Sequence, residues 1–209
     1  MIEIYNEDCM EAMKHMEDNQ FDLAIVDPPY GIGNFTPQNN APRQKKVDKA
    51  VEWNDDIPNK QYFKELLRVS KNQIIWGANY YNCFSNGKGA IVWYKGGNNT
   101  KNMSDCEIAS CSQQKKIDYI KIYIEKGFLA KGIHTRIHPC QKPIKLYEWL
   151  LINYAKKKDK ILDTHLGSGS IAIACHNLGY DLVGYEIDKE YYESALKRYN
   201  EHIKQLTLF

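Results

Sequence analysis

The sequence predicts one α/β domain over residues 1–209, in which strands and helices alternate around a single sheet. Short apolar runs of strand length recur along the chain, and segments with helical periodicity separate them. A glycine-rich turn at 167–170 stands between one of these strands and the helix after it. The composition, with 43% hydrophobic and 26% charged residues, is that of a globular chain, and 209 residues suit one core better than several.

The first part of the chain contains four predicted strands and two predicted helices. The apolar run 21–26 ends abruptly before Pro28 and Pro29, because proline cannot continue a strand. Residues 31–56 show little periodicity, and a segment of this length without structure of its own is typically functional or disordered. The predicted strands are 2–5, 21–26, 73–76 and 90–94, and the predicted helices are 7–15 and 58–70.

Residues 96–137 are interpreted as an insertion or small subdomain. Glycines and asparagines at 96–99 indicate a loop, while 107–110 and 119–124 have the patterns of short strands. After Pro143 the alternation of strands and helices is clear again. The remaining elements are predicted as helix 144–155, strand 161–163, helix 171–178, strand 182–185 and helix 189–204.

The formal net charge is only +2, but residues 95–145 hold ten Lys/Arg against four Asp/Glu. Such a cluster supports an anionic partner without establishing one. The six cysteines form no C-x-x-C pair, so neither a metal site nor a disulfide framework is expected. No apolar run approaches the roughly 20 residues that cross a bilayer, and residues 1–10 lack the shape of an export signal, so we expect a cytoplasmic protein without a membrane partner.

The glycine-rich turn predicts a nucleoside-containing cofactor. Residues 161–172 match G-x-G-x-x-A, in which Gly167 and Gly169 let the backbone approach a ligand. Glu186 ends the next strand, where a carboxylate can accept hydrogen bonds from a ribose diol. Asp163, just before the turn, suits the ammonium group of S-adenosylmethionine and would repel the pyrophosphate of a dinucleotide. S-adenosylmethionine is therefore favoured over a dinucleotide.

Asp27, Pro28, Pro29 and Tyr30 follow a predicted strand, at the edge of the sheet where ligands bind. The two prolines fix the backbone, so we expect the Pro28 carbonyl to point outward without an internal partner. This carbonyl and the Asp27 carboxylate would grip the planar amino group of a nucleobase and favour the pyramidal form, whose lone pair attacks a sulfonium methyl. Tyr30 offers a ring on which a flipped base can stack, a contact worth about 1–3 kcal/mol.

These segments, in this order, resemble the β-type amino-methylating DNA methyltransferases, which act on adenine N6 or cytosine N4. The resemblance rests on Asp27-Pro28-Pro29-Tyr30, His138-Pro139-Cys140-Gln141-Lys142-Pro143, Asp163, Gly167-Ser168-Gly169-Ser170 and Glu186. It implies a Rossmann-like S-adenosylmethionine-dependent methyltransferase fold with circularly permuted motif order. A catalytic half (1–94) would precede a small inserted target-recognition region (95–137) and a cofactor-binding half (138–209).

The resemblance also implies roles for individual residues. Asp27, Pro28, Pro29 and Tyr30 would hold the target base. Asp8 would lie near the cofactor adenine, Glu186 at its ribose and Lys142 at its methionine carboxylate. The full set of implied cofactor-binding residues is Asp8, Asp27, Lys142, Asp163, His165, Gly167, Ser168, Gly169 and Glu186.

Two features depart from the usual pattern of that family. Many relatives carry Pro-Phe where Thr164 and His165 stand here, so we expect a more polar pocket, in which His165 has either a cofactor role or a structural one. The region between Lys95 and His138 holds only about 40 residues, too few to bury a substantial core alone. Either the recognised DNA word is short, or a second copy of the chain helps, as a homodimer.

We therefore expect a site-specific transferase that moves a methyl group from S-adenosylmethionine to N6 of a flipped adenine in duplex DNA. Adenine is favoured because Asp, in that family, more often opens the Pro-Pro-Tyr motif of adenine enzymes, and Ser that of cytosine enzymes. Cytosine N4, an RNA or protein-amide substrate, and a non-catalytic DNA-binding subunit of the same fold are the alternatives. The candidate phosphate contacts are Arg43, Lys45, Lys46, Lys49, Lys101, Lys115, Lys116, Lys131 and Arg136.

Overall fold

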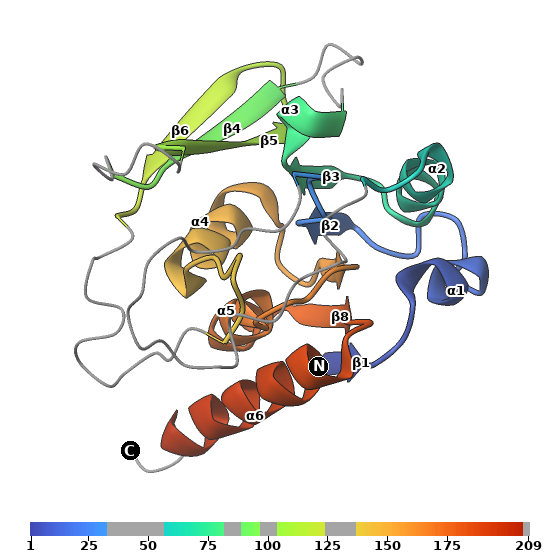
Figure 1. Ribbon diagram of the computed structural model, residues 1–209, viewed down its shortest axis with the longest axis vertical. Coiled ribbons are helices and arrows are strands. Elements are labelled where there is room, and N and C mark those ends of the chain that lie inside the picture. Colours follow the sequence, from blue (N-terminus) through green and yellow to red (C-terminus); the bar gives the residue numbers. More distant parts are fainter. Residues whose placement is uncertain (33–56, 82–88, 97–103, 124–136, 207–209) are drawn as a thin grey trace.

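The computed structural model describes residues 1–32, 57–81, 89–96, 104–123 and 137–206, and one eight-stranded sheet runs through them (Figure 1). The strands are β1 (Ile2–Tyr5), β2 (Leu23–Val26), β3 (Gln73–Trp76), β4 (Gly89–Tyr94), β5 (Cys106–Cys111), β6 (Ile117–Lys121), β7 (Lys160–Asp163) and β8 (Asp181–Tyr185). The helices are α1 (Cys9–Lys14), α2 (Lys60–Val69), α3 (Ala78–Tyr81), α4 (Ile144–Tyr154), α5 (Ser170–Leu178) and α6 (Lys189–Leu206).

The strands lie in the order β1-β8-β7-β2-β3-β5-β4-β6. Neighbouring strands are parallel except where β5 is involved, because β5 runs antiparallel both to β3 and to β4. Every residue of β2 and β3 is buried, as expected for central strands of a parallel sheet covered on both faces. The predicted α/β fold is confirmed.

Two apolar clusters fill the two faces of the sheet. On one face, α4 and α5 pack together and bury Leu146, Leu150 and Ile171. On the other face, α1 and α2 pack together and bury Met13 and Leu66. Figure 1 shows these two helix pairs on opposite sides of the strands. Because helices cover both faces, the ends of the strands are where side chains can meet a ligand.

Residues 104–123 belong to the region that the sequence indicates as an insertion or small subdomain. Their two strands join the main sheet, since β5 pairs with β3 on one side and with β4 on the other. The side chains of Ala109 and Cys111 are fully buried in the main core. The one described helix that was not predicted is α3, because four residues are too few to show a helical period.

The other predicted elements are found within a few residues of their expected ends. The segment 33–56, which makes up most of the aperiodic stretch 31–56, lies outside the described residues. None of the described helices is both long and apolar enough to span a membrane.

Candidate active site

Two adjacent strand ends, those of β2 and β7, define the candidate site. These strands are parallel neighbours, but the chain leaves β2 through α2 toward β3 and leaves β7 through α5 toward β8, on the other side. Such a reversal opens a crevice at the carboxyl ends of the strands, where ligands bind in open α/β sheets. Asp27 follows β2, and Asp163 ends β7. The two predicted motifs therefore reach the same crevice.

A cavity of about 170 Å³ lies at this crevice and joins the two motifs. From the β2 side it is lined by Asp27, Pro28, Pro29 and Tyr30. From the other side it is lined by Lys142, His165, Gly167, Ser168 and Glu186. Asp8, Asp163 and Gly169, which were also predicted to contact the cofactor, are not among the lining residues.

The glycine-rich turn has the left-handed backbone that its sequence suggests. Gly167 has φ +53° and Gly169 has φ +68°, a region that favours glycine. Arg198 of α6 supports the turn by donating hydrogen bonds to the Ser168 carbonyl (2.7 Å) and to Ser170 Oγ (3.0 Å). The turn therefore has a fixed shape at the start of α5.

Asp163 is buried just below the turn, with 1% of its surface exposed. Its Oδ1 accepts a hydrogen bond of 3.0 Å from the backbone N–H of His165. Burial raises the pKa of Asp163 to about 8, and that backbone N–H lowers it only in part. No cation of the described residues forms an ion pair with Asp163. A positively charged group on a ligand would stabilise this carboxylate.

Glu186 follows β8 and faces the cavity. Its Oε2 accepts a hydrogen bond from the backbone N–H of Gly167 (2.8 Å), and its Oε1 accepts one from the backbone N–H of Asp188 (2.9 Å). Burial raises the pKa of Glu186, and both N–H groups oppose that rise. Each oxygen keeps a second lone pair, so the carboxylate is held in place and can still accept from a ligand's hydroxyl groups.

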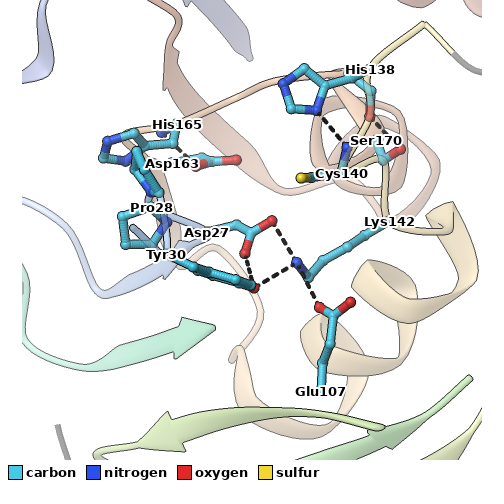
Figure 2. Close-up of polar contacts among 12 residues, drawn as sticks. Asp27, Pro28, Tyr30, Glu107, His138, Cys140, Lys142, Asp163, His165 and Ser170 are labelled. Atoms are coloured by element: carbon cyan, nitrogen blue, oxygen red, sulfur yellow. Dashed lines mark hydrogen bonds and ion pairs between the residues drawn. The ribbon is translucent and has the colours of Figure 1, made fainter. Parts of the chain in front are cut away.

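Asp27 belongs to a buried network of charged groups, drawn in Figure 2. The Lys142 ammonium donates to Asp27 Oδ2 (2.5 Å) and lies 3.0 Å from Glu107 Oε2. Tyr30 Oη donates to Asp27 Oδ1 (2.6 Å). Lys95 donates to the other oxygen of Glu107 (3.0 Å). Two carboxylates and two ammonium groups thus balance in charge, and both oxygens of Asp27 are occupied.

The backbone after Asp27 differs from its expected state. Tyr81 of α3 donates a hydrogen bond to the Pro28 carbonyl (2.5 Å) and lies equally within reach of the Pro29 carbonyl (2.7 Å). The expectation that the Pro28 carbonyl has no internal partner is therefore wrong. A phenol from a helix with no sequence signature supplies the partner. A carbonyl has two lone pairs, so Pro28 can still accept a second hydrogen bond.

The Tyr30 ring packs against α3 and also lines the cavity. It stacks on Tyr80 of α3, with ring centroids 5.0 Å apart and planes 17° apart. Gly77, with φ +74°, lets the ring lie against its backbone, because a Cβ there would collide with the ring. Burial and then the charge of Asp27 raise the pKa of Tyr30, so its hydroxyl keeps its proton. Tyr30 is held between α3 and Asp27.

Lys142 lies two residues before the start of α4, and only 4% of its surface is exposed. Burial by itself would lower the pKa of Lys142, but the carboxylates of Asp27 and Glu107 raise it above its ordinary value. Its ammonium also lies 5.4 Å from the ring centre of Trp76, a fully buried residue at the end of β3. The predicted partner of Lys142 was a cofactor carboxylate, whereas here two protein carboxylates hold it.

Two further candidates have structural partners. Asp8 is exposed and caps α1, because its side chain accepts from the backbone N–H of Met10 (2.8 Å). His165 contacts Thr164 Oγ1 through Nδ1 (2.9 Å) and meets the Tyr62 ring edge-on. Burial lowers the pKa of His165 to about 4, so the imidazole that lines the cavity is neutral near pH 7.

Of the candidate phosphate contacts, the structure describes Lys115 and Lys116, which are exposed in the turn between β5 and β6. Lys116 forms an ion pair of 3.0 Å with Asp118. The other seven candidates lie outside the described residues: Arg43, Lys45, Lys46, Lys49, Lys101, Lys131 and Arg136. Among the described residues, no cluster of three or more His, Cys, Asp or Glu could hold a metal ion.

Comparison with known proteins identifies the family. The sequence profile of the DNA methylase family matches residues 67–197, more than half of the chain. The chain belongs to the DNA methylase family. This family comprises the N6-adenine and N4-cytosine DNA methyltransferases, so the resemblance found in the motifs is confirmed.

Two curated relatives of this DNA methylase are type II methyltransferases. M.HpaI of Haemophilus parainfluenzae is 27% identical, over 91% of this chain and 71% of its own. M2.MboI of Moraxella bovis is 27% identical, over 95% of this chain and 87% of its own.

Solved structures agree with the fold. The M1.HpyAVI–SAM complex has a TM-score of 0.60 and 23% identity, covering 95% of this chain and 100% of its own. The PvuII DNA methyltransferase, which is cytosine-N4-specific, has a TM-score of 0.63 and 11% identity. The match covers 95% of this chain and 86% of the PvuII enzyme. The predicted Rossmann-like methyltransferase fold is confirmed.

Four residues of the site escaped the sequence analysis: Tyr80, Tyr81, Lys95 and Glu107. Tyr80 and Tyr81 lie on α3, and Lys95 and Glu107 lie at the paired ends of β4 and β5. None of the four belongs to a motif. The only available signal was an isolated acidic residue, Glu107, at the start of an otherwise uncharged strand.

Proposed function

We propose that this DNA methylase transfers a methyl group from S-adenosylmethionine to the N6 amine of adenine in duplex DNA. The observation that carries this proposal is the shared cavity, in which Asp27 and Tyr30 lie opposite Gly167, Ser168 and Glu186. A methyl transfer requires donor and acceptor within one cleft, because the new bond forms along a direct line between them.

The methyl donor is S-adenosylmethionine, and the residues around the glycine-rich turn suit it. When bound, it supplies an electrophilic methyl group attached to a positively charged sulfur. Glu186 would accept hydrogen bonds from the two ribose hydroxyls, since two backbone N–H groups already fix its orientation. Asp163 would pair with the ammonium group, because this buried carboxylate has no ion-pair partner among the described residues.

Asp27 is the residue that would act on the target amine. The lone pair of an exocyclic amine is delocalised into the base, and acceptors that hold its hydrogens favour the reactive pyramidal form. In the structure Tyr30 occupies Asp27 Oδ1, so we expect the incoming base to displace that hydroxyl and to stack on the ring. The N–C bond would form as the bond between the methyl carbon and sulfur breaks, with its electron pair left on sulfur, and the amine would then lose a proton to Asp27. Burial raises the pKa of Asp27, which favours its acceptance of that proton.

Adenine is preferred on the identity of the first motif residue, Asp27. Cytosine N4 is the second candidate, because a carboxylate accepts hydrogen bonds from either amine and a cytosine-N4-specific enzyme shares this fold. A non-catalytic subunit is not favoured, since the residues for both donor and acceptor line the same cavity. Duplex DNA would contact exposed lysines such as Lys115 and Lys116, and a second copy of the chain would enlarge a small recognition surface.

Methyl transfer is tested with the purified full chain, S-adenosylmethionine labelled in the methyl group, and mixed-sequence duplex DNA. After digestion to nucleosides, we expect label in N6-methyladenine. Label only in N4-methylcytosine would overturn the adenine assignment, and label only in RNA or protein added in parallel would overturn the DNA substrate.

The Asp27→Asn variant is the matched control for this assay. It removes the negative charge and one acceptor without changing side-chain size. We expect transfer to fall by about 100-fold or more, the scale of a lost acid–base group. Cofactor affinity, measured by calorimetry, should stay within a few fold of wild type. An equal loss of both in a folded variant would mean that Asp27 serves the cofactor instead of the amine.

A further inference from the structure

Glu107 reaches the catalytic edge of the sheet because β5 is reversed. Parallel strands bring their carboxyl ends to this edge, whereas an antiparallel strand brings its beginning. Glu107 is the second residue of β5 and pairs in register with Trp93, near the end of β4. No sequence motif includes it, yet Figure 2 shows its side chain directed at Lys142 from the side opposite Asp27.

The contacts form a chain of alternating charge. Glu107 Oε2 lies 3.0 Å from the Lys142 ammonium, which in turn contacts Asp27 at 2.5 Å. Glu107 Oε1 accepts from Lys95 at 3.0 Å. The side chains of Lys142 and Lys95 are 3% and 8% exposed, so neither ammonium group can rely on water for its stabilisation.

The methyl-transfer reaction would disturb this row of alternating charges at Asp27. To accept the target amine, Asp27 must turn at least part of its carboxylate away from its present partners. A buried cation that loses its only partner is strongly destabilised. Lys142 avoids this state because a second carboxylate remains beside it.

We propose that Glu107 is a positioning residue, which holds Lys142 against Asp27 at rest and remains as the partner of Lys142 while Asp27 engages the amine. This inference rests on the proposed function. Glu107 lies outside all of the sequence motifs described above. Lys95 completes the arrangement by keeping Glu107 itself paired.

The charged groups around Asp27 determine whether its pKa rises or falls when Glu107 is replaced. Burial raises the pKa of Asp27, the charge of Lys142 lowers it, and the charge of Glu107 raises it again. Tyr30 also faces Asp27 and lowers its pKa through a hydrogen bond, while Asp163 and Tyr147 sense the charge of Asp27 from β7 and α4. Replacing Glu107 by glutamine removes only one of these charges, so the pKa of Asp27 should fall.

The first test is a titration that needs no activity. Protein labelled with ¹³C in its aspartate and glutamate carboxylates is followed by NMR, and the Asp27 signal is assigned by its loss in Asp27→Asn. In Glu107→Gln we expect Asp27 to titrate at lower pH than in wild type. Glu65→Gln is the matched control, since it removes the same charge from an ion pair with Arg68 on α2, and it should leave Asp27 unchanged.

A second variant covers the case in which Glu107→Gln does not fold. In Lys142→Met, the two carboxylates that share the ammonium lose it together, so Asp27 and Glu107 should both titrate at higher pH than in wild type. An unchanged Glu107 signal in this variant, or an unchanged Asp27 signal in Glu107→Gln, would overturn the proposal.

The kinetic test separates positioning from cofactor binding. In Glu107→Gln, Lys142 keeps Asp27 as its only charged partner, so we expect kcat to fall by about tenfold, with the KM for S-adenosylmethionine within about threefold of wild type. Glu107→Asp, which keeps the charge, should recover part of kcat. Unchanged kcat in Glu107→Gln would contradict the positioning role. If the Asp27 and Glu107 signals shift in the variants as expected but the wild-type protein transfers no methyl group, only the proposed function is contradicted.

Discussion

At the scale of single residues, Asp163 and Glu186 are two buried carboxylates in different states. Glu186 accepts two backbone hydrogen bonds that oppose the effect of burial on its pKa. Asp163 accepts one, and its pKa rises to about 8. Asp163 therefore holds a proton near pH 7 until a cation approaches, whereas Glu186 is fixed in place as an acceptor.

The raised pKa of Asp163 predicts a pH dependence of stability. An unfolded aspartate loses its proton near pH 3.8, while Asp163 in the folded protein keeps it up to about pH 8. Between these values the folded state binds more protons than the unfolded state, so the contribution of Asp163 to the free energy of unfolding falls as pH rises. In Asp163→Asn this decline should disappear, as measured by urea unfolding from pH 5 to about pH 8.5.

His165 affects the same curve in the opposite direction. Burial lowers its pKa from 6.5 to about 4, so its contribution to stability is lost as pH falls through that window. The variant is therefore compared with wild type at each pH, which cancels the contribution of His165. Identical pH profiles for wild type and Asp163→Asn would contradict the buried, protonated state of Asp163.

Glu186 predicts a change in cofactor affinity. Glu186→Ala removes an acceptor directed at the cavity, so S-adenosylmethionine should bind more weakly by about 1–3 kcal/mol, the range for hydrogen bonds to a charged group. Calorimetry measures this difference directly. Glu193→Ala on α6 removes an exposed carboxylate and should change nothing. Unaltered affinity in Glu186→Ala would exclude the ribose role.

At the scale of elements, α3 and β5 contribute what the motifs do not. α3 brings Tyr80 and Tyr81 against the segment after β2, and β5 brings Glu107 to the same edge. α3 has only four residues and was not predicted, whereas β5 was predicted as a strand but its place between β3 and β4 was not. Periodicity reports which face of an element is buried and says nothing about strand order.

Tyr81 predicts an effect of α3 on catalysis. Tyr81→Phe keeps the ring but removes the hydrogen bond to the carbonyls of Pro28 and Pro29. We expect a loss of about 0.5–1.5 kcal/mol in the free energy of unfolding, typical of one hydrogen bond, and a larger relative fall in kcat, because the loop that holds Asp27 loosens. Tyr80→Phe, which keeps the stack on Tyr30, is the control. Wild-type kcat in Tyr81→Phe would show that the prolines alone fix the loop.

The sequence was most informative where chemistry is encoded by local motifs. Asp27, Tyr30, Lys142, Gly167 and Glu186 were all singled out, and all line one cavity. Their partners were less accessible: the pairing of Lys142 with Glu107 joins residues 35 positions apart, on different elements. Contacts of this kind depend on which strands are neighbours, and β5 lies between β3 and β4 against chain order.

At the scale of the whole molecule, a sheet between two helical layers holds the site in place. Lys142 precedes α4 by two residues, and the buried face of α4 packs on the same core as β3, β4 and β7. The site therefore depends on this packing, although none of the core side chains touches a ligand. A change in the core should act on both stability and the charged network.

Leu150 in α4 provides the test, because its side chain is fully buried in that core. Leu150→Ala should lower the free energy of unfolding by about 2–5 kcal/mol through lost contacts and a cavity. Ile152→Ala, in the same helix but 65% exposed, should have little effect on chemical denaturation. Equal destabilisation by the two variants would mean that α4 does not pack as described.

The position of Trp76 gives the protein a built-in optical reporter. Its indole is shielded from water and lies 5.4 Å from an ammonium group whose partners should rearrange when a base arrives. Indole emission shifts in wavelength when a neighbouring charge moves. Fluorescence titration with unlabelled oligonucleotides could therefore follow occupancy of the cleft in real time, and Trp76→Phe would identify the signal.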